Sequence, residues 1–204
     1  MLKNSWVKEI LEWVLCFVIA YAIYLVINYF IGTIAGVKQS SMYPTSKEGD
    51  RVVISRRVLF NKSLNRSDVV ILEAPIDVEQ NETDFAVYED KNGLEYFTYN
   101  VIGLGKRSYI KRIIGLPGDH LYIAERGEVY INHELLDEPY LIEDLKTPRT
   151  GNYYDVQIPE GYVFVMGDNR EGSRDSRELG LIPIEKIEGK VVIRIWPLNK
   201  IGKL

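Results

Sequence analysis

The sequence predicts a mainly β protein: an all-β domain of antiparallel sheets, preceded by one N-terminal transmembrane helix. Two observations lead to this fold class. The stretch from Trp13 to Val37 carries no charged residue. Beyond residue 38, short runs of β-branched and aromatic residues alternate with Gly, Pro, Asn and Asp, as in barrels and sandwiches built from many short strands. A chain of 204 residues is long enough for one such domain and the helix.

The N-terminal helix is predicted at residues 10–37, after a short tail at residues 1–9. About 25 uncharged residues form a helix of roughly 37 Å, which exceeds the hydrocarbon core of about 30 Å. Trp6 and Trp13 lie near one end, where interfacial aromatic residues gather. The alternative, a cleavable signal peptide, would have a shorter apolar region ending in a small-residue cleavage site. Lysines and arginines lie on both sides of the stretch, so charge alone does not fix its orientation.

Residues 38–204 form the predicted β domain. Its expected strands lie at residues 50–55, 68–74, 85–90, 109–115, 120–125, 128–134, 162–167 and 190–196. The sequence "ERGEV" predicts a hairpin turn that joins residues 121–125 to 128–132. A polar stretch at about residues 77–107 predicts an exposed ribbon or loop inserted between core strands, and residues 183–187 predict a helical turn.

Composition excludes several classes of site. The net charge of −4 argues weakly against a nucleic-acid footprint, which would show a basic excess. The only cysteine, Cys16, lies in the apolar stretch, so no disulfide framework, cysteine metal site or thiol nucleophile is expected. Two histidines, His120 and His133, are too few for a multi-histidine metal centre. No metal and no other cofactor is therefore predicted.

The stretch "YIKRIIGLPGD" at residues 109–119 places two basic residues in an otherwise apolar strand. Alternation directs Lys111 to one strand face and Arg112 to the other. One interpretation is an edge strand protected from aggregation by a lysine. The other is an amine in an apolar pocket, where lost hydration lowers the pKa toward neutrality and a neutral amine can accept a proton from a serine. The stretch alone leaves both open.

Two further stretches carry hydroxyl and charged groups. "KQSSMYPTSKEGD" follows the apolar segment, with Pro44 fixing the backbone soon after Ser41. "GDNREGSRDSRELG" at residues 167–180 begins with a turn signal and is, by itself, typical of a solvated loop. Its Ser173, Asp175 and Arg177 stand at alternate positions, which share one side of an extended backbone. A hydroxyl and an ion pair on one side are able to orient a nearby amine.

In this order after one apolar span, "SMYPT", "GDRVVI", "YIKRIIGLPGD" and "GDNREGSRDSR" closely resemble bacterial type I signal peptidases of the Gram-positive form. The resemblance covers the span and most of residues 36–197. It implies that Ser41 is the nucleophile and Lys111 the general base. It also implies that Ser173 holds the lysine amine toward Ser41, and that a structural ion-pair cluster of three residues braces the site: Asp175, Arg177 and Arg112.

The resemblance further implies an oxyanion hole and a substrate pocket. The backbone N–H of Ser41 would be one oxyanion donor. Some relatives carry a serine two residues before the nucleophile, where this chain has Gln39, and a leucine commonly stands where this chain has Ser46, which predicts a more polar pocket. The candidate residues around the oxyanion hole and pocket are Gln39, Ser40, Met42, Tyr109 and Ile110.

The function implied is a membrane-bound serine endopeptidase that removes signal peptides from exported precursors, cleaving after small residues of the Ala-X-Ala type through an acyl-enzyme. The implied partners are signal peptides of secreted preproteins and the lipid bilayer, with the secretion translocon as a further candidate and no nucleic acid. The implied location is the cell membrane, single-pass, with the N-terminus cytoplasmic and the catalytic domain extracytoplasmic. Two alternatives stay open: a specialised peptidase dedicated to one substrate such as a pilin subunit, and a catalytically inactive, membrane-anchored homologue that binds signal peptides.

Overall fold

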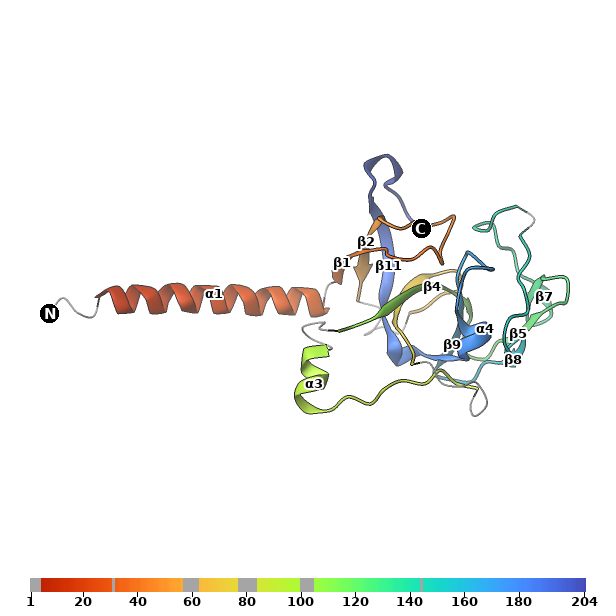
Figure 1. Cartoon of the computed structure of the whole chain (residues 1–204), viewed down its shortest axis with the longest axis horizontal. Coiled ribbons are helices and arrows are strands. Elements are labelled where there is room, and N and C mark those ends of the chain that lie inside the picture. The colour runs from red at the N-terminus through yellow and green to blue at the C-terminus, as the bar shows by residue number, and fades with distance from the viewer. Residues whose placement is uncertain (1–4, 31, 57–62, 77–83, 100–104, 144) are drawn as a thin grey trace.

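The computed structural model describes residues 5–30, 32–56, 63–76, 84–99, 105–143 and 145–204. Within these ranges, one long helix, α1 (Ser5–Phe30), precedes strands that form two antiparallel sheets, and the other helices are short. Figure 1 shows α1 extending away from the β domain. The predicted fold class, a mainly β domain preceded by one apolar helix, is confirmed.

Helix α1 has the length and composition of a membrane span. Its apolar section covers 22 residues, Trp6–Ile27, and none of it is buried against the rest of the described chain. Large side chains such as Trp13 and Phe17 are exposed along it. A continuous apolar surface of this length is stable in a bilayer and costly in water.

The helix differs from the predicted residues 10–37 at both ends. It begins at Ser5, and Lys8 and Glu12 form an i,i+4 pair in its first turns. Beyond its end, Gly32–Gly36 is strand β1, which pairs along its whole length with β2 (Arg51–Ser55). Gly32 has φ +142°, and a Cβ there would overlap the carbonyl oxygen of Ile54. An uncharged composition does not distinguish helix from strand, so only the pairing with β2 decides this boundary.

The larger sheet has seven strands in the order β1-β2-β11-β3-β4-β9-β10, and every neighbouring pair is antiparallel. Beside β1 and β2 it contains β3 (Val69–Glu73), β4 (Ser108–Gly115), β9 (Tyr162–Met166), β10 (Ile182–Pro183) and β11 (Ile187–Trp196). Strands far apart in sequence are therefore neighbours. In particular, β4 lies between β3 and β9, inside the sheet.

The smaller sheet has four strands in the order β7-β6-β5-β8. They are β5 (His120–Ile123), β6 (Val129–Ile131), β7 (Glu134–Leu135) and β8 (Asp155–Gln157). Strands β5 and β6 pair in register, with Tyr122 opposite Tyr130, which confirms the predicted hairpin. The short helices are α3 (Gly93–Phe97), α4 (Ser176–Leu179), η2 (Ile184–Lys186) and η3 (Leu198–Lys200), and η2 matches the predicted helical turn.

The strand predicted at residues 85–90 is wrong. Phe85 forms an isolated bridge with Leu181, and single backbone hydrogen bonds join Ala86 to Leu181 and Ile76 to Val87. Among the described residues, no strand runs alongside this segment, so no continuous ladder forms there. This segment belongs to the predicted insertion at 77–107, of which residues 77–83 and 100–104 lie outside the described part of the chain. The described remainder contains helix α3 and no strand before β4.

Strand β4 is held by the core on both of its faces. Three buried clusters make up the core, and each contains one residue of β4: Ile110, Ile113 and Ile114. The cluster of Ile110 also contains Met42, which is fully buried. Since Met42 directly follows Ser41 in the chain, the same apolar contacts fix β4 and the segment after β1 relative to each other.

Candidate active site

Ser41 begins a turn at residues 41–45, between β1 and β2. Two backbone hydrogen bonds close this loop at its base, from Val37 N–H to the Asp50 carbonyl and from Gly49 N–H to the Val37 carbonyl. Ser41 is 6% exposed, and its hydroxyl is buried with no hydrogen-bond partner in the described part of the chain. Since buried polar groups are nearly always paired, an unpaired hydroxyl in a fixed turn is a candidate reactive group.

Lys111 lies on β4 and is 2% exposed. Because β4 is an interior strand, the interpretation of this lysine as edge-strand protection is wrong. Its Nζ donates a hydrogen bond to Ser173 Oγ over 3.0 Å. No carboxylate forms an ion pair with it among the described residues. The amine is therefore removed from water without a direct counterion.

This environment lowers the pKa of Lys111 to about 8, from an ordinary value of 10.5. Burial is the main cause, because an ammonium loses its hydration in the interior. The charge of Asp175 opposes the shift, Arg177 adds to it, and Asp168 opposes it again more weakly. A substantial fraction of this amine is therefore neutral near pH 8, where an exposed lysine is almost wholly charged.

A chain of hydrogen bonds orients the lysine. The Ser173 hydroxyl donates to Asp175 Oδ2 over 2.7 Å, so its oxygen lone pairs face Lys111. Asp175 in turn accepts from the Gly167 backbone N–H, and Arg177 binds both of its carboxylate oxygens at 2.8 and 2.9 Å. Because Lys111 Nζ is the donor toward Ser173, the lone pair of the neutral amine stays free to accept a proton from another group.

The ion pair of Asp175 and Arg177 does not arise from an extended backbone, as their spacing predicted. Residues Ser176–Leu179 form α4, and Asp175 is its N-cap, accepting a hydrogen bond from the Arg177 backbone N–H. The Arg177 side chain then folds back over the cap and also donates to the Ser173 carbonyl. Neither charged side chain is exposed, so the pair fixes the segment that carries Ser173.

Gly167 lies between the two serines. A Cβ at this position would overlap both the Ser41 carbonyl oxygen and Ser173 Oγ, so only glycine lets the two segments approach this closely. The next residues strengthen the contact, because the Asn169 backbone N–H donates to the Ser41 carbonyl over 3.0 Å. Ser41 and the Ser173–Lys111 pair therefore belong to one site. No direct hydrogen bond joins Ser41 to Lys111 in the described structure.

Arg112 belongs to a separate ion pair, not to the cluster of Asp175 and Arg177 that the resemblance implied. It binds both carboxylate oxygens of Asp168, at 2.8 and 2.7 Å, and donates to the Ser67 carbonyl. Thr45 Oγ1 donates to the same carboxylate over 2.5 Å. Alternation along β4 explains the separation, since Lys111 and Arg112 point to opposite faces. This second pair ties the turn of Ser41 to β4 and to the start of the 167–180 loop.

Sequence reasoning missed several residues that shape the site. Asp168 and Arg170 are fully or almost fully buried, although they stand in a stretch typical of a solvated loop. Arg170 Nε donates to the Gly167 carbonyl, and its guanidinium pairs with Glu138 at 2.5 Å. The signal available in the sequence was the concentration of Gly, Asp and Arg directly after the apolar run of β9. What it did not contain was the partner, Glu138, which lies outside any of the quoted motifs.

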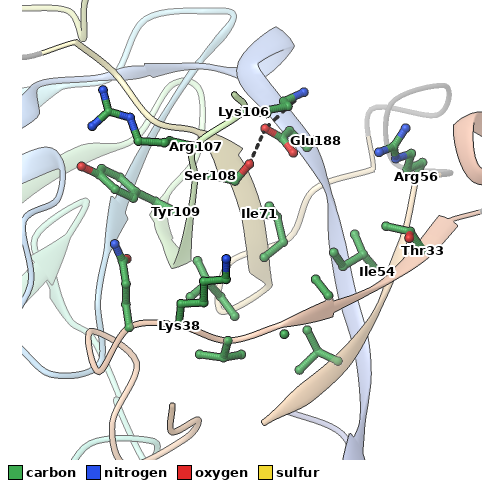
Figure 2. Close-up of a pocket in the computed structure, with 16 residues that line it drawn as sticks. Thr33, Lys38, Ile54, Arg56, Ile71, Lys106, Arg107, Ser108, Tyr109 and Glu188 are labelled. Carbon is green, nitrogen blue, oxygen red and sulfur yellow. Dashed lines mark hydrogen bonds and ion pairs between the residues drawn. The ribbon is translucent and has the colours of Figure 1, made fainter. Parts of the chain in front are cut away.

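A groove of about 490 Å³ runs along β1. Ser41, Lys111 and Ser173 do not line it, but residues close to the first two in the chain do. Of the predicted pocket residues, Gln39, Tyr109 and Ile110 line it, whereas Ser40 and Met42 do not. Figure 2 shows Lys38 and Tyr109 on opposite sides of this groove. Ser46 does not line it either, because its buried hydroxyl donates to Asp50. The prediction that Ser46 makes the pocket more polar therefore does not apply to this groove.

The two histidines lie in the smaller sheet. His120 is on β5 and forms a 2.8 Å contact with Asp155, and the ring of His133 lies tilted against it, with the ring centroids 5.5 Å apart. Within the described ranges, neither histidine forms a hydrogen bond or ion pair with Ser41, Lys111 or Ser173. In the part of the chain that the structure describes, the candidates for proton transfer beside Ser41 are therefore Lys111 and Ser173.

Comparison with known proteins identifies clear relatives. The family model described as "Signal peptidase, peptidase S26" matches residues 10–196. "Signal peptidase IB" of Staphylococcus aureus (strain COL) is 33% identical over 208 residues, covering 95% of this chain and 93% of the relative. "Signal peptidase I" of Bacillus licheniformis is also 33% identical, covering 98% and 94%. A crystal structure of a signal peptidase I from Enterococcus faecalis V583 aligns with a TM-score of 0.40 and 23% identity, over 63% of this chain and 96% of that one.

Proposed function

Since this chain belongs to the signal peptidase family, peptidase S26, and is thus a serine peptidase that removes signal peptides, we propose that Ser41 is its nucleophile and Lys111 its general base. The observation that carries the proposal is the meeting, across Gly167, of a buried unpaired hydroxyl and a buried amine without a counterion. The lowered pKa of Lys111 supports the same assignment.

The reaction proceeds by acyl transfer. Neutral Lys111 accepts the Ser41 proton while Oγ bonds to the scissile carbonyl carbon, and the ammonium then gives a proton to the departing amine. The signal peptide stays bound as an ester on Ser41. Lys111 next takes a proton from water, whose oxygen attacks the ester carbonyl, and the proton returns to Ser41. Ser173 is a positioning residue, because it holds the amine through the 3.0 Å bond.

The oxyanion of each tetrahedral intermediate needs preorganised donors. The backbone N–H of Ser41 supplies one in this proposal. The second comes from the Gln39 amide or from Ser40, which stand two positions and one position before the nucleophile. Gln39 lines the groove, and Ser40 is exposed beside Ser41.

Substrate binds in the groove as an added strand. An extended peptide lies between the backbones of residues 35–39 and 108–110, and alternate side chains point into the groove near Tyr109 and Ile110. Small side chains fit such shallow positions, which supports cleavage after an Ala-X-Ala segment. The proposed anchor is α1, whose apolar section crosses the cell membrane with its N-terminus cytoplasmic, so that the β domain meets precursors on the outer side.

The pH dependence of cleavage tests the general base. We expect kcat/KM to rise with pH and to level off above about pH 8, because the amine is active only when neutral. Two pH units below the pKa, the rate should be about 100-fold lower. The measurement is cleavage of a secretory precursor by the detergent-solubilised full chain between pH 5.5 and 10. The assignment would be contradicted by a profile that is flat from pH 6 to 9, or by one in which kcat/KM rises with an apparent pKa near 10.5.

Ser173→Ala tests the positioning role. We expect kcat to fall about 10- to 100-fold with little change in KM, because one hydrogen bond that orients the amine is lost. Ser176→Ala is the matched control: this serine is also buried, but its hydroxyl accepts a hydrogen bond from the Val165 backbone N–H and has no contact with the lysine. The control should lose stability without altering the pH–rate profile. Equal kinetic losses in the two variants would show that Ser173 acts only through folding.

A further inference from the structure

The groove combines an apolar floor with charged rims. Its floor includes Val52, Ile54 and Ile71, on the strands β2 and β3. One wall is residues 33–39, which span about 20 Å at strand spacing, and the other is residues 106–110. A peptide of about six residues in extended form therefore fits along it.

The rims of the groove are positively charged, although the whole chain has a net charge of −4. Four basic residues and one acidic residue line the groove: Lys38, Arg56, Lys106, Arg107 and Glu188. Glu188 already pairs with Lys106 at 3.3 Å and accepts a hydrogen bond from Ser108, as Figure 2 shows. Within the described ranges, no carboxylate pairs with the other three basic side chains. The groove therefore presents three cations to whatever occupies it.

These cations are distributed along the path of the bound peptide. Lys38 is adjacent to Gln39 at the end near Ser41, and Arg107 stands two residues before Tyr109 on the opposite wall. Arg56 and Thr33 lie at the far end of the groove in Figure 2. In an extended peptide, the side chains that alternate with those facing the floor point out of the groove, between its two rims. A carboxylate at such a position would meet Lys38 or Arg107 near the cut.

We propose that this groove selects substrates with an acidic side chain among the five residues before the scissile bond, at a position that faces the cationic rims. The inference rests on the proposed function, because it takes the groove as the binding site for the segment before the cut. It defines the substrate class further: small or apolar side chains toward the floor, alternating with at least one carboxylate.

Two peptides that differ in a single side chain test this selection. Each carries Ala-X-Ala before the scissile bond, with X either Glu or Gln, which have nearly the same shape. We expect kcat/KM for the Glu peptide to exceed that for the Gln peptide about 3- to 10-fold at low ionic strength, since rim charges are partly solvated. The preference should fall toward onefold in 0.5 M salt, because salt screens such pairs. Equal kcat/KM values for the two peptides at low salt would overturn the proposal.

Variants of the rim residues test whether these side chains cause the preference for Glu over Gln. In Lys38→Gln/Arg107→Gln, the Glu-to-Gln ratio should drop to about onefold, whatever the absolute rate. The matched control is Lys200→Gln, an exposed lysine outside the groove, which should keep the wild-type ratio. An unchanged ratio in the double variant would contradict the role of these two side chains. Circular dichroism and thermal melting of the same preparations show whether each variant is folded.

A binding measurement separates this inference from the proposed function. The affinities of both peptides for the full-length Ser41→Ala chain, measured by fluorescence anisotropy, give the Glu-to-Gln ratio without turnover. If the Ser41→Ala chain binds the Glu peptide more tightly but the wild type does not cleave precursor, the proposed catalysis is contradicted and the acidic preference of the groove is supported. Vesicles test whether the cations bind lipid headgroups instead. If the double variant loses activity only on vesicles of anionic lipid, and the Glu-to-Gln ratio is onefold for the wild type and the variant, the rims bind lipid and the proposal is overturned.

Discussion

Replacing Ser41 by alanine is expected to abolish cleavage, with kcat/KM falling by about 10⁴-fold or more. The proposed reaction forms its covalent bond at this oxygen, and Ser173 Oγ does not replace it, because it is engaged with both Lys111 and Asp175. The fold should be unaffected. The Ser41 hydroxyl makes no hydrogen bond in the described structure, so its removal breaks none. The measurement is precursor cleavage followed by gel or mass spectrometry, with a thermal melt of the same sample.

Ser63→Ala is the matched control for this variant, since Ser63 is an exposed serine outside the site. It should cleave at the wild-type rate. Acid quenching of the wild-type reaction should also trap a signal-peptide ester on Ser41, visible as a mass increase. Retention of more than a few per cent of activity in Ser41→Ala, or a trapped adduct on another residue, would exclude Ser41 as the nucleophile.

Replacing Lys111 by methionine is expected to remove activity at every pH and, at the same time, to stabilise the fold near neutral pH. Folding lowers the pKa of this amine from 10.5 to about 8, so the unfolded chain binds the proton more tightly. Below pH 8 that difference costs the folded state about 3 kcal/mol. Methionine has a similar length and carries no charge, so the cost disappears.

The sign of this effect gives a sharp test. Between about pH 8 and 10.5 the wild-type chain should gain stability as pH rises, because only the unfolded state still binds the proton. Lys111→Met should lack that gain, so the two stabilities converge toward pH 10.5. Chemical denaturation across this range measures both curves. If the wild type is as stable as the variant at pH 7, the amine is not held at a lowered pKa.

Lys111→Arg supplies the complementary control. It keeps a positive charge and hydrogen-bond donors, but a guanidinium does not deprotonate at working pH. We expect no cleavage between pH 6 and 10. Substantial activity of the arginine variant would show that position 111 acts as a fixed cation, and the general-base assignment would be withdrawn. Lys200→Met, at an exposed position, controls for the general effect of removing a lysine.

Local patterns in the sequence were enough for most of the fold. The strands around Val52, Val70, Tyr122 and Phe164 were all predicted from β-branched and aromatic runs. The errors fall where a local pattern fits two structures. Residues 32–36 are uncharged like the helix before them but pair with β2. Residues 85–90 have the composition of a strand, but within the described ranges no strand pairs with them. Whether a partner strand lies alongside is a property of the whole domain.

In the candidate site, too, local sequence predicted some features and only the fold decided the others. Ser41, Lys111 and Ser173 were chosen because their motifs resemble those of signal peptidases, and the fold places them around Gly167. Their roles stay predictions until the variants are measured. The ion-pair partner of Arg112 could not be predicted from the sequence around Arg112. Asp168 is more than fifty residues away along the chain, and the pairing of β4 with β9 brings the two together.

The sequence by itself determined that this chain carries one apolar helix and a domain of short strands, because hydrophobic content and side-chain alternation are local properties. It also determined which residues are chemically able to react. The tertiary structure alone decided that β4 is an interior strand, and hence that the Lys111 amine is dehydrated and weakly basic. It alone decided the charge of the groove as well, since Lys38, Arg56 and Arg107, which stand next to the ends of β1, β2 and β4, line one groove only in the folded sheet. Desolvation and charge proximity depend on contacts between distant segments, and those exist only in the folded chain.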